Sequence, residues 1–322
     1  MHADAQTGVC FGTLGDNLPP PREVVALCKQ HKIQRMRLYN PNQAILQALR
    51  GSGISVIVGV PNEDIQRISQ SVGAAQAWLQ ENILNNAGVD FRYIAVGNEI
   101  SPLDGGSARI APRVPPAMYN MKAALNRAGL GHKIKVSTAL STGILAQSFP
   151  PSAGSFRPEI RPSFLDPIIK FLVNSQFPLL LNVYTYFPYI DNQKDISLEY
   201  ATFTSPSVVV RDGPFQYKNL FDAIVDATYA ALEKAGGANV EIVVAESGWP
   251  SAGGTATSVD AARIYNTNLI NHVRGGTPKR PGKPIEAYIF DLIDEDKKSP
   301  EIEKHWGLFY ANKQPKYPIT FA

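Results

Sequence analysis

Cysteine is scarce in this sequence, because only Cys10 and Cys28 occur among its 322 residues. Two thiols are too few to form a disulfide framework, so the fold must depend on its hydrophobic core. We expect both thiols to be buried and free, with a single bridge between them as the alternative. The two cysteines and five histidines show no ligand-like spacing. We therefore expect no metal centre and no other cofactor.

Long apolar runs are also missing. No stretch approaches the roughly 18 residues that a membrane-spanning helix requires, so we expect no membrane partner. The formal net charge is only +3, and the basic residues are scattered apart from Lys279-Arg280 and Lys297-Lys298. Nucleic acid is therefore not an expected partner. Nothing in the pattern indicates an oligomerisation surface, and we expect a monomer.

The start of the chain has no recognisable targeting signal. Residues Met1–Ala5 contain no basic region followed by an apolar stretch, so we expect no signal peptide in this chain. A mature secreted protein that begins with a new initiator Met would look the same. No Asn-X-Ser/Thr sequence occurs, so N-glycosylation is not predicted.

Strand-like apolar runs, in contrast, recur along the chain and alternate with helical patterns. The strand-like runs are Gly8–Gly12, Met36–Tyr39, Ser55–Val60, Tyr93–Glu99, Lys133–Ala139, Leu179–Phe187, Glu241–Ser247 and Glu286–Ile293. The helical patterns are Pro21–His31, Gln43–Leu49, Ala74–Leu84, Pro116–Ala128, Phe164–Asn174, Asn219–Ala235 and Asp260–Val273. Several of these begin with Pro or Asp and end near Gly, as helices commonly do.

This alternation predicts an α/β fold, and at this length it favours a single (β/α)8 barrel with extended loops at the carboxyl-terminal face. An open dinucleotide-binding sheet is less favoured, because Gly8–Gly15 does not provide the glycine-rich phosphate turn that such a fold has after its first strand. We expect one catalytic domain over residues 1–322, with residues 1–7 either flexible or foreign to the natural chain.

Two glutamates stand at the ends of strand-like runs. Glu99 closes the run that begins at Tyr93, and Glu246 lies at the end of the run that begins at Ile242. In a parallel barrel the carboxyl ends of the strands carry the catalytic residues. A single acid at such a position often only caps a helix or neutralises an arginine. Two acids, flanked by Gly97-Asn98 and Ser247-Gly248-Trp249, favour the acid and carboxylate pair of a glycosidase.

The order of the runs places Glu99 at the end of the fourth strand and Glu246 at the end of the seventh. In an eight-stranded barrel these two acids can face each other across the mouth. A separation of roughly 5 Å between the carboxyl groups would imply a retaining mechanism, and one of about 6.5–9.5 Å would imply inversion.

Seven motifs in order resemble one known family over nearly the full chain length. They are Gly8-Val9-Cys10-Phe11-Gly12 with Asn17-Leu18-Pro19, Arg35-Met36-Arg37-Leu38-Tyr39, Tyr93-Ile94-Ala95-Val96-Gly97-Asn98-Glu99, Lys135-Val136-Ser137-Thr138, Asn182-Val183-Tyr184, Glu246-Ser247-Gly248-Trp249-Pro250-Ser251 and Gly307-Leu308-Phe309. Together they resemble the plant endo-β-1,3-glucanases of glycoside hydrolase family 17, which include pathogenesis-related and allergenic members.

The resemblance implies a retaining hydrolase in which Glu99 is the proton donor and later the general base, and Glu246 is the nucleophile. It implies that Asn98 hydrogen-bonds the sugar 2-hydroxyl and that Tyr184 orients the nucleophile. The other expected substrate contacts are the aromatic residues Tyr39, Phe187 and Trp249 and the polar residues Glu295, Lys298 and Glu303. An aromatic residue at a strand end is also commonly part of the core, and Asp294–Lys298 would otherwise resemble a solvated loop.

The sequence departs from the family pattern mainly near residue 291. Asp291 replaces a small residue and adds a buried charge that needs a partner or a raised pKa. Ile293 replaces an aromatic residue, which would remove a stacking platform at the rim. The milder departures are Phe11, Asn40, Thr185 and Trp306.

The resemblance thus predicts endo-hydrolysis of β-1,3-glucan, in plant defence or in glucan turnover of the cell wall. One alternative is hydrolysis of mixed-linkage β-1,3-1,4-glucan. A second is a glucan-binding defence protein with weakened catalysis. The resemblance also implies a secreted, cell-wall or vacuolar location.

Overall fold

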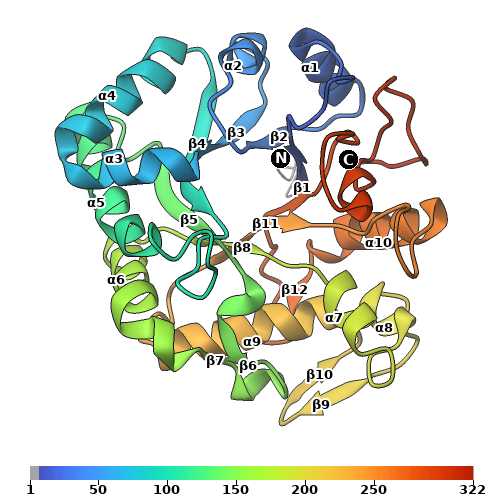
Figure 1. Cartoon of the computed structure of the whole chain (residues 1–322). Helices are drawn as coiled ribbons and strands as arrows, with labels where there is room; N and C mark the ends of the chain where they lie inside the picture. Colours follow the sequence, from blue (N-terminus) through green and yellow to red (C-terminus); the bar gives the residue numbers. More distant parts are fainter. Residues whose placement is uncertain (1–6, 322) are drawn as a thin grey trace.

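The computed structural model describes residues 7–321, and its centre is a closed barrel of parallel strands (Figure 1). The barrel strands are β1 (Thr7–Phe11), β2 (Arg35–Leu38), β3 (Ser55–Val60), β4 (Asp90–Asn98), β5 (Lys135–Ser141), β8 (Leu179–Asn182), β11 (Ile242–Ser247) and β14 (Ala287–Ile289). Their order around the barrel is β1-β14-β11-β8-β5-β4-β3-β2. The prediction of a (β/α)8 barrel is confirmed. The predicted loose start, residues 1–7, lies outside the described residues except for Thr7.

The strands are apolar because both of their faces are covered. Every residue of β1, β2, β8 and β11 is buried, as expected for strands that lie between a filled barrel interior and a ring of helices. Gly59 on β3 shows how closely the strands approach, since a Cβ atom there would lie 2.3 Å from the carbonyl oxygen of Tyr39. Only glycine fits at that position.

Helices surround the barrel, as Figure 1 shows. They are α1 (Pro21–Gln30), α2 (Gln43–Leu49), α3 (Ile65–Gln70), α4 (Val72–Asn82), α5 (Val114–Arg127), α6 (Asp166–Ser175), α7 (Tyr186–Asp191), α8 (Leu198–Ala201), α9 (Leu220–Lys234) and α10 (Val259–His272). Side-chain caps begin several of them. In α2, for example, Asn42 accepts hydrogen bonds from the amides of Ala44 and Ile45.

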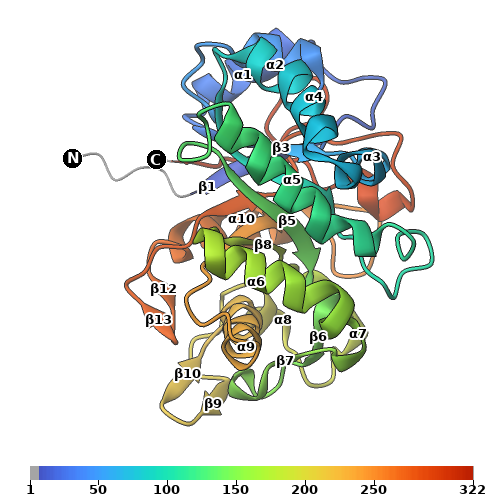
Figure 2. The same ribbon diagram turned by 90° about the vertical axis from the view of Figure 1, so that its left-hand side faces the viewer.

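Three short hairpins are attached to the barrel. They pair β6 (Leu145–Gln147) with β7 (Ser155–Phe156), β9 (Val210–Asp212) with β10 (Phe215–Tyr217), and β12 (Gly276–Thr277) with β13 (Arg280–Pro281). Helix α9 is buried along almost its whole length, because strands of all three hairpins pack against it. Figure 2 shows the hairpins grouped around α9.

Two predicted strands are shorter than expected. The run Leu179–Phe187 divides into β8, which ends at Asn182, and helix α7, which begins at Tyr186. The run Glu286–Ile293 pairs with neighbouring barrel strands only over Ala287–Ile289. In both runs the apolar residues continue past the strand because the loops above the barrel are themselves buried, so hydrophobicity alone does not mark the end of the strand.

The helical predictions are correct in place, although boundaries shift by about two residues, which is usual. Helix α3, which precedes α4, was not predicted. After β14 the described chain forms no further α-helix. A segment with one 3-10 turn at Glu301–Lys304 instead crosses the mouth of the barrel and pairs Ile293 with Phe309.

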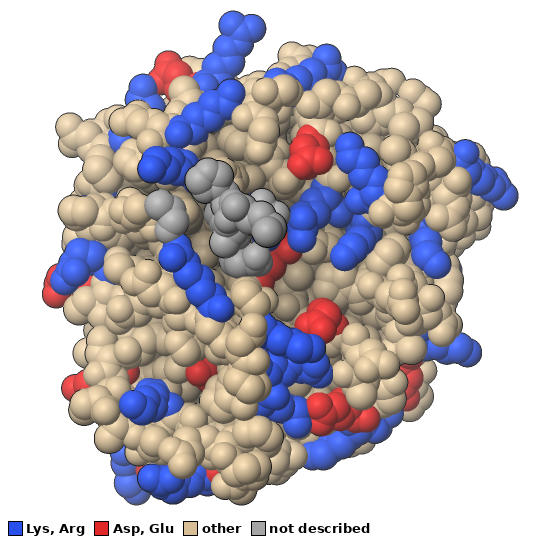
Figure 3. Space-filling model, turned by 180° about the vertical axis from the view of Figure 1, so that it is seen from behind, with Lys and Arg blue, Asp and Glu red and all other residues tan. Residues whose placement is uncertain are grey.

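A buried ionic group closes the opposite end of the barrel. Glu286 accepts hydrogen bonds from Arg92, Tyr93 and Tyr288 and lies 3.2 Å from Arg35. Figure 3, which shows the molecule from behind, shows Lys and Arg side chains spread over that face with fewer Asp and Glu.

No helix of the described residues has the length and apolar character needed to cross a membrane.

Candidate active site

A cleft of about 940 Å³ lies at the carboxyl ends of the strands. Residues at or just after the carboxyl ends of all eight barrel strands contribute to its lining. Among the predicted site residues, those that line the cleft are Tyr39, Asn98, Glu99, Tyr184, Phe187, Glu246, Glu295, Lys298 and Glu303. The long strand-end loops therefore bring together side chains that are as much as 264 residues apart in the sequence.

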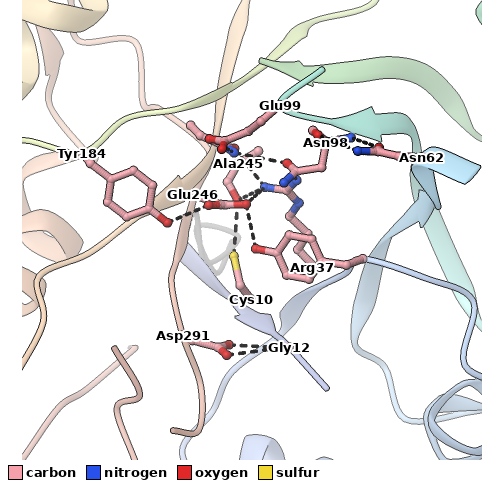
Figure 4. Close-up of polar contacts among 12 residues, drawn as sticks. Cys10, Gly12, Arg37, Asn62, Asn98, Glu99, Tyr184, Ala245, Glu246 and Asp291 are labelled. Carbon is pink, nitrogen blue, oxygen red and sulfur yellow. Dashed lines mark hydrogen bonds and ion pairs between the residues drawn. The ribbon is translucent and has the colours of Figure 1, made fainter. Parts of the chain in front are cut away.

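Both glutamates lie where a strand is irregular. Strand β4 has one extra residue relative to β5 between Ala95 and Asn98, and β11 has one extra residue relative to β8 between Val244 and Glu246. Such bulges redirect side chains at strand ends. In β4 the redirection is completed by left-handed backbone at Gly97 (φ 81°) and Glu99 (φ 52°). The carboxyl groups of Glu99 and Glu246 consequently both turn into the cleft (Figure 4).

Glu246 is buried and has three side-chain donors. Its Oε1 accepts hydrogen bonds from Arg37 Nη1 and from Tyr39 Oη, each at 2.8 Å, and its Oε2 accepts one from Tyr184 Oη at 2.6 Å. Burial, followed by the negative charge of Glu246, raises the pKa of Tyr184 well above its ordinary value, so this phenol remains a donor. Hydrogen bonds of this kind favour the ionised carboxylate and fix its orientation.

Arg37 and Asn182 connect the two glutamates. The fully buried guanidinium of Arg37 donates to Asn182 Oδ1 at 3.0 Å and to Asn98 Oδ1 at 2.6 Å, in addition to Glu246. Asn182 Nδ2 in turn donates to Glu99 Oε1 at 2.9 Å. One continuous polar network therefore holds both carboxyl groups in place, and Figure 4 shows it at the centre of the barrel mouth.

The surroundings of Glu99 favour its protonated form. Loss of surrounding water raises the pKa of this carboxyl, and the negative charge of Glu246 raises it further. The hydrogen bond from Asn182 and the charge of Arg37 act in the opposite direction and are weaker. A raised pKa beside an ionised, multiply hydrogen-bonded carboxylate is the division of roles that a general acid and a nucleophile require.

Asn98 is positioned by its neighbour Asn62. The backbone amide of Asn98 donates to Asn62 Oδ1 at 3.0 Å, and Asn62 Nδ2 donates to the Asn98 carbonyl oxygen at 3.2 Å. The Oδ1 atom of Asn98 is occupied by Arg37. Because Oδ1 accepts the bond from Arg37, Nδ2 is the atom of the Asn98 side chain that can donate to a ligand in the cleft.

An aromatic wall lines the part of the cleft next to α7. Phe187 is 38% exposed and contacts the ring of Trp306 at a centroid distance of 5.8 Å. Tyr184 and Phe290 pack edge-on against the same indole. Phe187 thus has the exposed apolar surface expected of a sugar contact. Trp306, one of the residues that departs from the family pattern, packs against the Phe187 ring.

The prediction that Trp249 contacts sugar is wrong. Its side chain is 0% exposed, lies outside the cleft lining and packs against Tyr186 and Tyr265. The indole Nε1 donates to the carbonyl oxygen of Ala256. The chain turns after Ser247, which directs residue 249 behind α7 instead of into the cleft. Tyr39 does line the cleft, although the Arg37 guanidinium lies 4.6 Å from its ring centroid and occupies one face.

The polar cluster that follows β14 is assembled as predicted, but one member is buried. Lys298 Nζ lies 3.7 Å from Glu295 and 3.4 Å from Glu303, and it lies 4.3 Å above the ring of Phe290. Glu295 is buried and accepts a hydrogen bond from the backbone amide of Leu14 at 2.6 Å. Lys298 and Glu303 are thus the more accessible members.

Of the two main departures near residue 291, Asp291 behaves as expected and Ile293 does not. Asp291 is a buried acid with a raised pKa, as predicted, chiefly because of burial and then the charge of Glu295. Ile293 is 1% exposed, pairs with Phe309 and does not line the cleft, so the expected loss of a stacking platform there is not supported. Cys10 and Cys28 are both free and buried, as predicted.

Arg37, Asn182 and Asn62 were not assigned roles from the sequence. A signal was present for two of them, because Arg37 interrupts the buried strand Arg35–Leu38 and Asn182 ends the apolar run of β8. A charged or amide side chain on a fully buried strand needs polar partners. No group of three or more His, Cys, Asp or Glu side chains among the described residues is arranged to hold a metal ion.

Comparisons with known proteins show the family to which the chain is similar. A sequence model for the glycosyl hydrolases family 17 matches residues 7–321. The chain is 55% identical over 320 residues to a glucan endo-1,3-beta-glucosidase of Pisum sativum, which covers 99% of this chain and 86% of the pea protein. It is 52% identical over 322 residues to the basic vacuolar isoform GLB of glucan endo-1,3-beta-glucosidase from Nicotiana tabacum, covering 99% and 86% of the two chains.

A solved structure extends the agreement to three dimensions. It belongs to a pair of plant beta-glucan endohydrolases with distinct substrate specificities, and it superposes with a TM-score of 0.92 at 48% identity, covering 97% of this chain and 99% of the other. With the family match over residues 7–321, these similarities show that the chain belongs to family 17 of the glycosyl hydrolases.

Proposed function

We propose that this protein hydrolyses internal β-1,3-glucosidic bonds of glucans with retention of anomeric configuration, Glu99 acting as acid and base and Glu246 as nucleophile. The observation that carries the proposal is the asymmetry of the two carboxyl groups within one network. Glu246 has three donors, whereas Glu99 has one side-chain donor and a raised pKa. The substrate is suggested by the relatives that act as glucan endo-1,3-beta-glucosidases.

The first step transfers the glucosyl unit to the protein. Oε2 or Oε1 of Glu246 attacks the anomeric carbon while Glu99 gives its proton to the departing glycosidic oxygen, so that one chain end leaves and a glucosyl ester forms. The amide of Asn98 is placed to donate to the sugar 2-hydroxyl as positive charge develops on the ring. The net charge of the two glutamates is unchanged, because Glu99 becomes a carboxylate as Glu246 becomes an ester, and Arg37 stays hydrogen-bonded to Oε1 of Glu246.

The second step returns the catalyst to its starting state. Ionised Glu99 removes a proton from water, the water oxygen attacks the anomeric carbon, and Glu246 departs as a carboxylate. Every residue in this scheme belongs to one chain, so a monomer contains the complete site. The cleft receives residues from all eight strand ends, which suits a polymer that lies across it rather than a chain end in a closed pocket.

Mixed-linkage β-1,3-1,4-glucan is the second candidate substrate. It is favoured by the similarity to one of two plant endohydrolases with distinct substrate specificities. We expect β-1,3-glucan to be preferred, since the chain is 55% and 52% identical to two relatives named glucan endo-1,3-beta-glucosidase. The vacuolar isoform among them supports a vacuolar location, with secretion as the alternative. A role in plant defence or in cell-wall glucan turnover is part of the proposal.

The test compares hydrolysis of laminarin with that of lichenan, with NMR of the first-formed anomer. Glu246→Gln and Glu99→Gln are compared with Glu241→Gln, because Glu241 is an exposed residue immediately before β11, at the far end of the strand that carries Glu246. We expect the wild-type protein to release short products from laminarin with the β-anomer formed first. Glu246→Gln and Glu99→Gln should abolish this release, and Glu241→Gln should retain it.

Other outcomes would redirect the proposal. Preference for lichenan would assign the mixed-linkage activity, and first-formed α-anomers would replace retention by inversion. Glucan binding without product release from the wild-type protein would identify a binding protein with weakened catalysis. Normal rates in Glu246→Gln would overturn the assignment of the nucleophile.

A further inference from the structure

Two buried carboxyl groups lie beside the segment that follows β1, and that of Glu295 also lines the cleft. Asp291 is 1% exposed and Glu295 is 3% exposed. The backbone amide of Gly12 lies 3.4 and 3.3 Å from the two carboxylate oxygens of Asp291. A Cβ atom on Gly12 would lie 2.2 Å from Oε1 of Glu295. Gly12 therefore contacts both acids, and Figure 4 shows Asp291 directed toward it.

These acids position parts of the cleft. Glu295 Oε2 accepts the hydrogen bond from the amide of Leu14, and Glu295 Oε1 faces Lys298 at 3.7 Å. Gly12, Leu14 and Lys298 all line the cleft. Both carboxyl groups thus contact segments that line the cleft. Glu295 lines the cleft itself, whereas Asp291 does not.

The positive charge around the pair is too small to balance it. Lys298 is the one cation that forms an ion pair with Glu295 in the described part of the chain, and it is shared with Glu303 at 3.4 Å. From the carboxyl-terminal segment Lys316 also acts on Asp291, but Lys316 is paired with Asp294 at 2.6 Å. From β1 the neighbouring titratable group is the thiol of Cys10, whose pKa is raised by burial and by Glu246.

Two buried carboxyl groups cannot both ionise at low cost when the one lysine paired with them is also paired with Glu303. Burial raises the pKa of Asp291 well above its ordinary value, and the negative charge of Glu295 raises it further. Such an arrangement favours the state in which Asp291 is protonated while Glu295 pairs with Lys298.

We propose that Asp291 and Glu295 share one proton, and that this proton keeps the Gly12–Leu14 segment and Lys298 in their substrate-binding positions. The inference rests on the glucan hydrolase function proposed above and adds a positioning residue, Asp291, to its site. Loss of the proton to solvent at alkaline pH leaves two adjacent negative charges. Their repulsion displaces Glu295, which releases the amide of Leu14 and moves Lys298, so substrate binding weakens.

The experiment measures binding of laminarihexaose by calorimetry from about pH 4 to about pH 9. The Glu99→Gln variant is used as the background, because it prevents turnover and removes the titration of Glu99. In this background we expect affinity to fall at least about tenfold toward alkaline pH. Adding Asp291→Asn should abolish the fall, because the Asn amide donates to Glu295 and has no proton to lose in this range.

The matched control adds Asp226→Asn instead. Asp226 is also a buried acid with a raised pKa, but it lies on α9 and away from the cleft lining. The control should retain the alkaline fall in affinity. If Asp291→Asn does not fold, as judged by circular dichroism, Glu295→Gln removes the same shared proton from the other side and should likewise flatten the profile.

The outcomes separate this inference from the proposed function. If the Glu99→Gln variant binds laminarihexaose at no pH, the proposed function fails. If it binds, but with an affinity that is independent of pH, the shared proton has no role in binding. If the alkaline fall survives in the variants of Asp291 and Glu295, another group is responsible and the inference is overturned.

Discussion

The side-chain amide of Asn182 donates a hydrogen bond to Glu99 over 2.9 Å. The other end of the same amide accepts from Arg37 Nη1 at 3.0 Å, and Arg37 pairs with Glu246. Asn182 therefore joins the proposed acid to the group that holds the nucleophile. The bond to Glu99 favours the ionised carboxyl, so it lowers the pKa of Glu99 against the stronger effect of burial.

Replacement of Asn182 by Ala should uncouple the two carboxyl groups. We expect kcat on laminarin to fall by about ten- to one hundredfold, since one charge-assisted hydrogen bond and the orientation of Glu99 are lost. The alkaline limb of the profile of kcat/KM against pH should move to higher pH, because the pKa of Glu99 rises. Asn239→Ala, at an exposed position, is the control. An unchanged alkaline limb in Asn182→Ala would contradict the proposed effect on Glu99.

The raised pKa of Glu99 makes a second prediction about pH. A general acid acts only while it is protonated, so kcat/KM should decline as pH rises through the pKa of Glu99 in the free protein. That decline should be centred above the ordinary value of 4.5. Substrates with an activated leaving group need less protonation, and on them the decline and the loss caused by Glu99→Gln should both be much smaller. Equal losses on laminarin and on an activated substrate would argue against Glu99 as the acid.

The two tyrosines on Glu246 should differ in importance. Tyr184 is the one side-chain donor to Oε2 in the described structure, whereas Tyr39 shares Oε1 with Arg37. Hydrogen bonds to charged groups contribute about 1.5–3 kcal/mol, so Tyr184→Phe should lower kcat by about ten- to one hundredfold. Tyr39→Phe should lower it less.

Steady-state kinetics on laminarin tests this ranking, with the exposed Tyr310→Phe as the control for loss of a phenol. Both active-site variants retain the aromatic ring, so the aromatic packing of the cleft should persist and KM should change less than kcat. A larger loss in Tyr39→Phe than in Tyr184→Phe would show that Oε1 is the oxygen whose orientation limits the rate.

Much of this architecture could be predicted from the sequence because the signals were local. Glu99 and Glu246 each lie at the end of a continuous apolar run, and the order of these runs along the chain shows which strand each acid ends. The bulges that aim both side chains into the cleft could not be predicted in the same way. They depend on registers between strands that are 40 or more residues apart, such as Ala95 with Ser137.

Trp249 and Ile293 show the limit of arguments from residue type. An aromatic residue after a catalytic strand is equally suited to stack on sugar or to fill space behind a helix, and only the path of the chain after Ser247 decides between them. In the same way, the pattern around Asp291 predicted a buried acid but not its contact with the Gly12 segment, which begins 279 residues earlier.

Asp226 is buried on α9, and its carboxylate connects two hairpins to that helix. Its Oδ2 accepts hydrogen bonds from Tyr217 Oη at 3.0 Å and from the amide of Lys279 at 2.9 Å. Burial, opposed by these hydrogen bonds, raises the pKa of Asp226 from 3.8 to about 6. An acid whose pKa is raised on folding binds its proton more tightly in the folded state. The associated stability is complete below the unfolded pKa of 3.8 and is lost as pH rises through about 6.

The Asp226→Asn variant should therefore gain stability relative to the wild-type protein as pH rises from about 4 to about 6.5, because the amide cannot ionise. The difference in pKa corresponds to roughly 3 kcal/mol across that window, reduced by whatever relaxation admits water to the ionised carboxylate. Urea unfolding of both proteins at a series of pH values measures it, with the exposed Asp195→Asn as the control. Since Asn Oδ1 can keep both hydrogen bonds, the hairpins should stay attached. A stability difference that is constant between about pH 4 and 6.5 would mean that Asp226 ionises as readily in the folded state as in the unfolded chain.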